Sequence, residues 1–189
     1  RRASGCTARE SSGCSEGYKE EEVGPRRAGP AIKADQWLQI RPGTDGALAL
    51  GIAWVMLSES GYDHDFVHRW TNAPLLIHES EGRSLTASDI GAPEGADRSV
   101  GWDQGRSAPV VMAANPAQQV KTDWLLTGEV TVDGPRGAIV CRPVFDHYYA
   151  LCAEWSPERT AEVTGVPADQ IRDTARLLWA SRPVSYYAW

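Results

Sequence analysis

The sequence predicts an α/β fold, part of a doubly wound domain pair around a parallel sheet, with an irregular loop and hairpin insertion. The first observation is a strand-like apolar run at residues 37–40, which a turn separates from a helix-like apolar run at residues 47–57. The second is a pair of helical patterns, one from residue 157 to a stop at residue 165 and one that begins within residues 166–169 and runs through about residue 179. The third is residues 72–137, where turn residues interrupt short apolar runs.

Residues 1–22 are predicted to be poorly ordered or a degenerate segment. They are rich in serine, glycine and charge, and they show no apolar periodicity. Residues 13–17 match the GxSxG pattern of serine hydrolases, which requires a buried strand before the serine and a helix after it. Both flanks are polar here, so we interpret the match as chance.

Residues 23–72 are predicted to form a strand–helix unit that contains a nucleotide pocket. The strand at residues 37–40 is followed by Pro42 and Gly43, which force a turn. Thr44 and Asp45 then stand where a helix N-cap is expected. Because the run after them is apolar on every side, the helix is predicted to be buried on most sides, up to a stop at Gly61.

The order of strand, tight turn and helix start favours ligand binding. It leaves backbone N–H groups and the positive end of the helix dipole pointing at a ligand. The side chain of Asp45 can also accept hydrogen bonds from the N–H and NH₂ edge of a purine. An ordinary capped connection with no ligand remains the alternative.

A second helix is predicted around His64 and His68, with Asp63 as its N-cap. Two histidines four residues apart share a helix face and can bind zinc. The glutamate of an HExxH motif is absent, because Asp65 follows His64. We therefore prefer an exposed amphipathic helix to a zinc site.

Residues 73–140 are predicted to be an irregular, lid-like insertion, with a hairpin at residues 128–134. Residues 141–189 are predicted to contain helices and a terminal strand. The first helix falls within residues 141–155, and one of its faces is expected to carry four residues: Val144, Tyr148, Leu151 and Cys152.

Two further helices are predicted to follow, because Pro157 suits the first helical position and Gly165 a helix end. A strand is predicted at residues 184–189. The helix pair also resembles a helix-turn-helix, but a DNA reader needs basic and amide groups at the start of its second helix. Ala168 and Asp169 stand there, so packing is the preferred interpretation.

Charge and cysteine usage exclude several classes of protein. The net charge of −6 argues against a broad nucleic-acid surface, and no apolar run reaches the length of a membrane span. The four cysteines form no CxxC pair, so an iron–sulfur or structural zinc site is unsupported. Cys141 and Cys152 are interpreted as core residues, with a metal site that includes His147 as the alternative.

The string RPGTDGALALG at residues 41–51 closely resembles the molybdopterin oxidoreductase family, which includes formate dehydrogenases, dimethyl sulfoxide reductases and thiosulfate reductases. The resemblance continues through GYDHDFV and WTNAP at residues 61–74 and closes with AEVTGVPA at residues 161–168. It covers roughly residues 23–189. The family usually carries a Val-Asp-Pro-Arg strand end upstream, where this chain has Gly24 in place of the acid.

The resemblance implies that the chain holds the guanine nucleotide part of bis-molybdopterin guanine dinucleotide, the molybdenum cofactor. It assigns this role to Gly43, Thr44 and Asp45, together with Pro42 and Arg26. It also implies a Rossmann-like fold, and two-electron redox chemistry or oxygen-atom transfer in the complete enzyme.

The same resemblance allows an iron–sulfur cluster in the complete protein, although not in this chain, and it implies a partner that transfers electrons through iron–sulfur clusters. No molybdenum ligand is recognisable here, and neither nucleic acid nor direct membrane insertion is expected. We therefore interpret the chain as an internal fragment of the catalytic subunit, inactive in isolation. A non-catalytic nucleotide-binding or structural α/β module is the alternative, and the compartment stays open.

Overall fold

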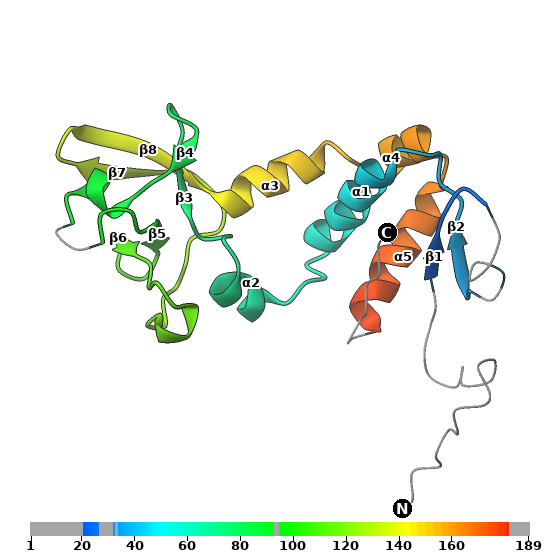
Figure 1. Cartoon of the computed structure of the whole chain (residues 1–189), viewed down its shortest axis with the longest axis horizontal. Helices are drawn as coiled ribbons and strands as arrows, with labels where there is room; N and C mark the ends of the chain where they lie inside the picture. Colours follow the sequence, from blue (N-terminus) through cyan, green and yellow to red (C-terminus); the bar gives the residue numbers. More distant parts are fainter. Residues whose placement is uncertain (1–20, 27–31, 33, 93–94, 182–189) are drawn as a thin grey trace, which may run out of the picture. The chain divides into compact units, whose positions relative to one another are not determined.

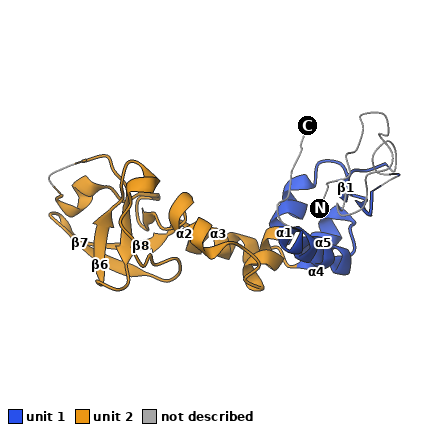
Figure 2. Ribbon diagram, turned by 90° about the horizontal axis from the view of Figure 1, so that it is seen from below, with its two compact units in different colours: residues 1–52, 157–189 blue, residues 53–156 orange. Residues whose placement is uncertain are grey.

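The computed structural model describes residues 21–26, 32, 34–92 and 95–181, and Figure 1 shows the order of their elements. Over these residues the fold is mixed α/β, with five α-helices and small sheets that are mostly antiparallel. The chain divides into two compact units, which Figure 2 colours separately. Unit 1 comprises residues 1–52 and 157–189, and unit 2 comprises residues 53–156.

Unit 1 is built on a short parallel pair of strands, β1 (Glu21–Val23) and β2 (Gln36–Leu38), in which Val23 lies opposite Leu38. It also contains the first half of helix α1 (Asp45–Ser58), helix α4 (Pro157–Thr164) and helix α5 (Ala168–Ala180). A buried apolar cluster joins the strand, α1 and the α4–α5 region, and its members are Leu38, Ile40, Leu48, Val166 and Ile171.

The doubly wound parallel sheet predicted from the sequence is not seen in the described residues. Among the described strands, only β1 and β2 pair in parallel, and the other two sheets are antiparallel. A doubly wound sheet needs several parallel strands with crossover helices between them, and these residues supply only one parallel pair of strands. Glu21 and Glu22 belong to β1, so the segment predicted to be poorly ordered contains strand residues at its end.

Helix α1 confirms the predicted strand–turn–helix order, but its burial differs from the prediction. Within the described structure only Leu48, Gly51 and Val55 of this helix are buried. Two residues after the last helical residue, Ser60 adopts a left-handed conformation (φ 56°), and the Gly61 N–H donates to the Met56 carbonyl at 2.7 Å. The predicted glycine stop is therefore displaced by one residue, because a serine occupies the position with positive φ.

Unit 2 contains a four-stranded antiparallel sheet in the order β4-β3-β8-β7 and a two-stranded ribbon, β5-β6. Its core is a buried apolar cluster whose members are Leu76, Leu85, Val100, Val132 and Cys141. The strands are β3 (Leu76–His78), β4 (Arg83–Ser84), β5 (Val100–Asp103), β6 (Ala108–Val111), β7 (Val130–Gly134) and β8 (Gly137–Pro143). The helices are α2 (His64–Trp70), α3 (Val144–Ala153) and the 3₁₀ turns η2 (Ala87–Ile90) and η3 (Pro116–Gln118).

The irregular insertion predicted at residues 73–140 contains most of these short strands. Its hairpin is longer than predicted, because residues 130–134 form only its first strand and the turn falls at Pro135 and Arg136. Residues 141–143 complete strand β8, and helix α3 follows within residues 141–155, where a helix was predicted. Its buried residues are Phe145 and Cys152, whereas Tyr148 and Leu151, expected on the packed face, are exposed.

Four predictions remain, for the two ends of the chain, for the last two helices and for membranes. The serine hydrolase pattern at residues 13–17 and the strand at residues 184–189 lie outside the described residues. The helices predicted from Pro157 and through about residue 179 are confirmed as α4 and α5. Among the described helices, none is both long and apolar enough to cross a bilayer.

Candidate nucleotide site

The turn between β2 and α1 is held by the carbonyl of Arg41. This oxygen accepts from the Thr44 N–H at 3.3 Å and from the Thr44 hydroxyl at 2.7 Å. Pro42 and Gly43 fill the two central positions, and Gly43 has φ 79°. This is the pattern of a type II turn, which requires positive φ at its third residue and so favours glycine there.

Helix α1 then begins at Asp45, as its first bond runs from the Leu48 N–H to the Thr44 carbonyl at 3.1 Å. The first N–H groups of a helix have no intrahelical acceptor. In the described part of the chain, no other group accepts from the N–H of Asp45, Gly46 or Ala47. The predicted helix start therefore presents free donors and the positive end of the helix dipole.

The described residues leave space beside this turn. A Cβ atom added to Gly43 or to Gly46 would meet none of their atoms within 4 Å. The Asp45 side chain is exposed, and no described residue pairs with its carboxylate. An acidic group at a helix N-terminus repels phosphate and attracts N–H donors, so this end of the site suits the edge of a guanine ring better than a phosphate.

Arg26 lies after the end of the neighbouring strand, β1. Parallel strands bring their carboxyl ends to the same edge of a sheet, which is where α/β proteins bind ligands. The segment is tied to β2 by the Gly24 N–H, which donates to the Leu38 carbonyl at 3.1 Å, and by the Trp37 indole N–H, which donates to the Gly24 carbonyl at 3.1 Å. Arg26 is exposed at this edge, and its contact with a nucleotide stays a prediction.

The role of Arg41, the residue that follows the predicted strand, was not predicted from the sequence. The Arg41 guanidinium donates through Nη1 to the carbonyls of Glu162 and Val163, at 2.5 and 3.1 Å. The Arg41 N–H donates to the Thr164 carbonyl at 2.8 Å. The turn is therefore fixed to the carboxyl end of α4. No local sequence pattern around residue 41 predicts hydrogen bonds to residues that lie 121 and 122 positions away.

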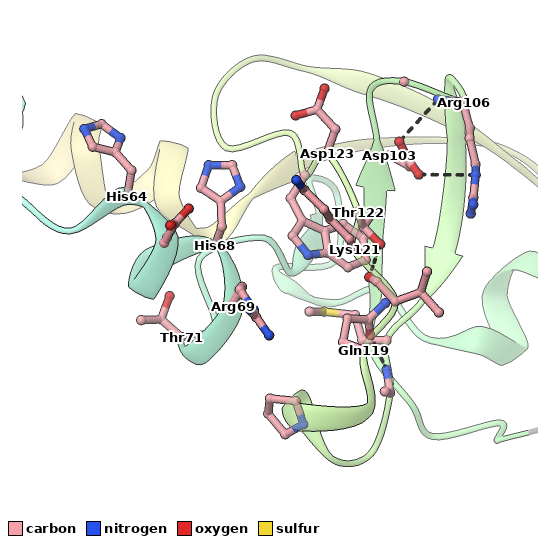
Figure 3. A pocket seen from close by; sticks show the side chains of 17 residues that line it. His64, His68, Arg69, Thr71, Asp103, Arg106, Gln119, Lys121, Thr122 and Asp123 are labelled. Carbon is pink, nitrogen blue, oxygen red and sulfur yellow. Dashed lines mark hydrogen bonds and ion pairs between the residues drawn. The ribbon is translucent and has the colours of Figure 1, made fainter.

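The two histidines considered for zinc binding lie on α2 in unit 2, where they line an open concavity of about 860 Å³ (Figure 3). Asp63 accepts from the Phe66 N–H at 2.9 Å, so the predicted N-cap is confirmed. The concavity mixes basic side chains, such as Arg69 and Lys121, with aspartates. Within the described residues no group of three or more histidine, cysteine or acidic side chains is placed to hold a metal.

The cysteines and the helix pair are explained better by packing than by metal or DNA binding. Cys141 and Cys152 are buried free thiols, and burial raises the pKa of Cys141 to about 11, which disfavours the thiolate that metals bind. His147 pairs with Glu79 at 2.9 Å. In the helix pair, Arg172 contacts Glu158 and Asp169, so a DNA-binding surface loses one of its few basic groups.

Comparisons with known proteins agree with the resemblance. No family model matches the chain. The alpha subunit of perchlorate reductase from Dechloromonas aromatica is 29% identical over 88% of this chain, which is 21% of that protein. One subunit of the sulfite dehydrogenase from Allochromatium vinosum is 33% identical over 81% of this chain and 16% of its own length. A solved structure of acetylene hydratase from Pelobacter acetylenicus aligns over 88% of this chain and 13% of its own, with 22% identity and a TM-score of 0.48.

The chain thus spans about a fifth of the length of these relatives. The alpha subunits of a respiratory nitrate reductase and of a dimethylsulfide dehydrogenase also match, over 77% and 84% of this chain. The match to the sulfite dehydrogenase subunit, at 33% identity over 81% of this chain, supports the assignment to a family. The chain therefore belongs to the molybdopterin oxidoreductases of the dimethyl sulfoxide reductase family, as a partial homologue of their catalytic subunits.

Proposed function

We propose that this chain supplies the pocket for the guanine nucleotide part of bis-molybdopterin guanine dinucleotide. The observation that supports this proposal is the turn at residues 41–45. Among the described residues, it presents backbone N–H donors that have no acceptor, an exposed Asp45 carboxylate that has no partner, and space beside Gly43 and Gly46. This combination of donors and acceptor matches the mixed hydrogen-bonding edge of guanine.

Each residue has a distinct part in the proposal. Asp45 accepts from the guanine edge, while the N–H groups at the start of α1 face the ligand. Gly43 permits the turn, and Pro42 fixes its first central residue. Arg26, exposed at the end of β1, contributes positive charge for a phosphate at the same edge of the sheet.

The complete protein is proposed to be a molybdenum-dependent oxidoreductase that carries out two-electron redox chemistry or oxygen-atom transfer. The cofactor, when bound, supplies the metal and dithiolene chemistry, and the residues of this chain bind and orient its nucleotide end. The same proposal includes an iron–sulfur electron-transfer partner and a larger doubly wound sheet, to which β1 and β2 contribute. The partner follows from the family, and the larger sheet follows from the parallel strand pair of unit 1.

The test compares Asp45→Ala and Asp45→Asn in the complete catalytic subunit, with molybdenum and guanine content as the readout. A charge-assisted hydrogen bond of this kind contributes about 1.5–3 kcal/mol, so the alanine variant is expected to retain at least tenfold less cofactor under exchange. Asparagine is expected to retain more than alanine if shape dominates, and as little if charge does.

Asp65→Ala is a matched control, because Asp65 is an exposed acid in the first turn of another helix, α2. It removes the same helix-dipole interaction without touching the proposed pocket. Cofactor content in Asp45→Ala equal to that of Asp65→Ala and wild type would contradict the assignment.

A further inference from the structure

Arg41 links two parts of unit 1 that are far apart in the sequence. Its side chain and its N–H bind three successive carbonyls at the end of α4, those of Glu162, Val163 and Thr164. The last carbonyls of a helix have no intrahelical donor, and a cation is favoured beside them. Arg41 therefore satisfies this helix end from outside the helix.

The carbonyl of Arg41 stabilises the turn at residues 41–45, which forms the proposed nucleotide pocket. It accepts from both the N–H and the hydroxyl of Thr44, the residue that precedes α1. The Thr44 carbonyl in turn accepts the first helical bond of α1. A continuous set of hydrogen bonds thus runs from the end of α4 through Arg41 to the start of α1.

The α4 end is itself shaped to receive the arginine. Gly165 has φ 82°, and its N–H donates to the Ala161 carbonyl at 2.8 Å, so the helix ends in a left-handed residue. A Cβ atom at Gly165 would lie 3.5 Å from Nε of Arg41. The guanidinium therefore lies directly against the turn between α4 and α5.

We propose that Arg41 is a positioning residue for the nucleotide pocket, which it holds in place by fixing residues 43–45 to the end of α4. The proposal rests on the proposed guanine site, and it adds that the α4–α5 turn is part of that site's support. Arg41 acts through Thr44 and the α1 start rather than by touching the nucleotide. Both N–H groups of its Nη1 are directed at the carbonyls of α4, and we assign the direct contacts to residues 43–45.

The test titrates the 189-residue chain with guanosine and with guanosine monophosphate, followed by NMR, in wild type, Arg41→Ala and Arg41→Lys. A positioning role predicts that alanine weakens both ligands by the same factor, about tenfold, because the loss of about one charge-assisted hydrogen bond loosens the turn. Lysine, which keeps a cation at the helix end, is expected to recover part of the affinity. Amide hydrogen exchange at Thr44 and Leu48, whose N–H groups donate to the Arg41 and Thr44 carbonyls, should also rise in the alanine variant without any ligand present.

Two further variants sharpen the result. Gly165→Ala strains the α4 end without removing charge, and it is expected to weaken both ligands as Arg41→Ala does. Arg172→Ala is the control: it removes an arginine that bridges α5 and α4 through Glu158, away from the turn, and should leave both affinities unchanged. All titrations are read under conditions where circular dichroism shows each variant folded.

The outcomes separate the two proposals. If wild type binds guanosine no better than adenosine, the guanine site itself fails and the role of Arg41 fails with it. If wild type binds guanosine and Arg41→Ala binds it equally well, only the role of Arg41 is overturned. A loss confined to guanosine monophosphate also overturns it, because that pattern means direct contact with the phosphate.

Discussion

Asp89 shows how a single buried charge can organise a loop in unit 2. The residue is 5% exposed, and its carboxylate accepts two hydrogen bonds from Arg83, of 2.7 and 2.9 Å. Arg136 contacts it from the β7–β8 turn at 3.2 Å, and Thr86 donates from both its N–H and its hydroxyl. The hydrogen bonds from Arg83, and after them those from Thr86, hold the pKa of the Asp89 carboxyl well below its usual range.

This lowered pKa predicts an acid-sensitive stability. A carboxyl with a depressed pKa in the folded state stabilises the fold above its unfolded pKa of about 4, and the contribution is lost as the pH falls through the folded value. Replacing Asp89 by Asn should cost about 2 kcal/mol at pH 7, because Arg83 and Arg136 lose their charged partner. The difference from wild type should shrink below about pH 4, as measured by urea unfolding from about pH 2 to pH 7.

Asp133→Asn provides the control, since Asp133 is exposed on β7 and no described residue pairs with its carboxylate. It changes the net charge equally and should leave the free energy of unfolding within about 0.5 kcal/mol of wild type at pH 7. A difference between wild type and Asp89→Asn that persists unchanged at about pH 2 would show that the carboxylate is not the stabilising form.

The residue scale also shows what the sequence can and cannot reveal. Thr44 and Asp45 were placed correctly at the helix start, because capping signals act over three or four residues. The roles of Arg41 and Asp89 were not foreseen. Arg41 binds backbone carbonyls 121 and 122 residues away, and any residue type can supply a carbonyl. The assignment of Asp45 to guanine came from family resemblance and stays a prediction.

At the scale of elements, the close approach of α1 and α4 depends on Gly51. A Cβ atom at this position would lie 2.4 Å from Oγ1 of Thr160 and 2.7 Å from its Cγ2. Thr160 is fully buried, so its side chain has no free space to retreat into. Glycine within a helix normally costs up to about 1 kcal/mol relative to alanine, and here it is required by packing.

Gly51→Ala is therefore expected to destabilise unit 1 by about 1–2 kcal/mol, because the overlap outweighs the gain in helix propensity. Gly46→Ala, in the same helix but with open space around the added Cβ, should be neutral or stabilising by up to about 1 kcal/mol. Chemical unfolding of both variants checks the sign. Adding Thr160→Ala to Gly51→Ala should recover part of the loss, and strictly additive effects would contradict the contact.

Elements with strong local signals were predicted well, and those set by distant pairing were not. The starts of α4 and α5 follow from proline and capping patterns. The hairpin was misplaced because strand β8 pairs on its other side with β3, far earlier in the chain, and this pairing extends it to Pro143. Helix α3 starts at Val144 because residues 141–143 belong to that strand.

At the scale of the whole molecule, much apolar surface is left uncovered by the described residues. Helix α1 is apolar on all sides, yet only three of its residues are buried. Helix α2 has no buried residue, although it carries Phe66 and Trp70, which are 55% and 51% exposed. The sequence predicted a doubly wound sheet that would cover such surface, whereas the described residues contain one parallel pair of strands.

Exposed apolar side chains of this size predict self-association of the isolated chain. Phe66 and Trp70 lie four residues apart and therefore share one face of α2, where their burial between two copies would stabilise a dimer. Sedimentation velocity over a wide concentration range should show a concentration-dependent oligomer in wild type. Phe66→Ser with Trp70→Ser should weaken that association at least about tenfold, since burying each large side chain contributes about 1.5–3 kcal/mol.

Asp65→Ser with Arg69→Ser, which alters polar residues of the same helix and keeps both aromatic groups, should associate as wild type does. A monomeric wild-type chain, or equal association in both double variants, would mean that this face of α2 does not drive self-association.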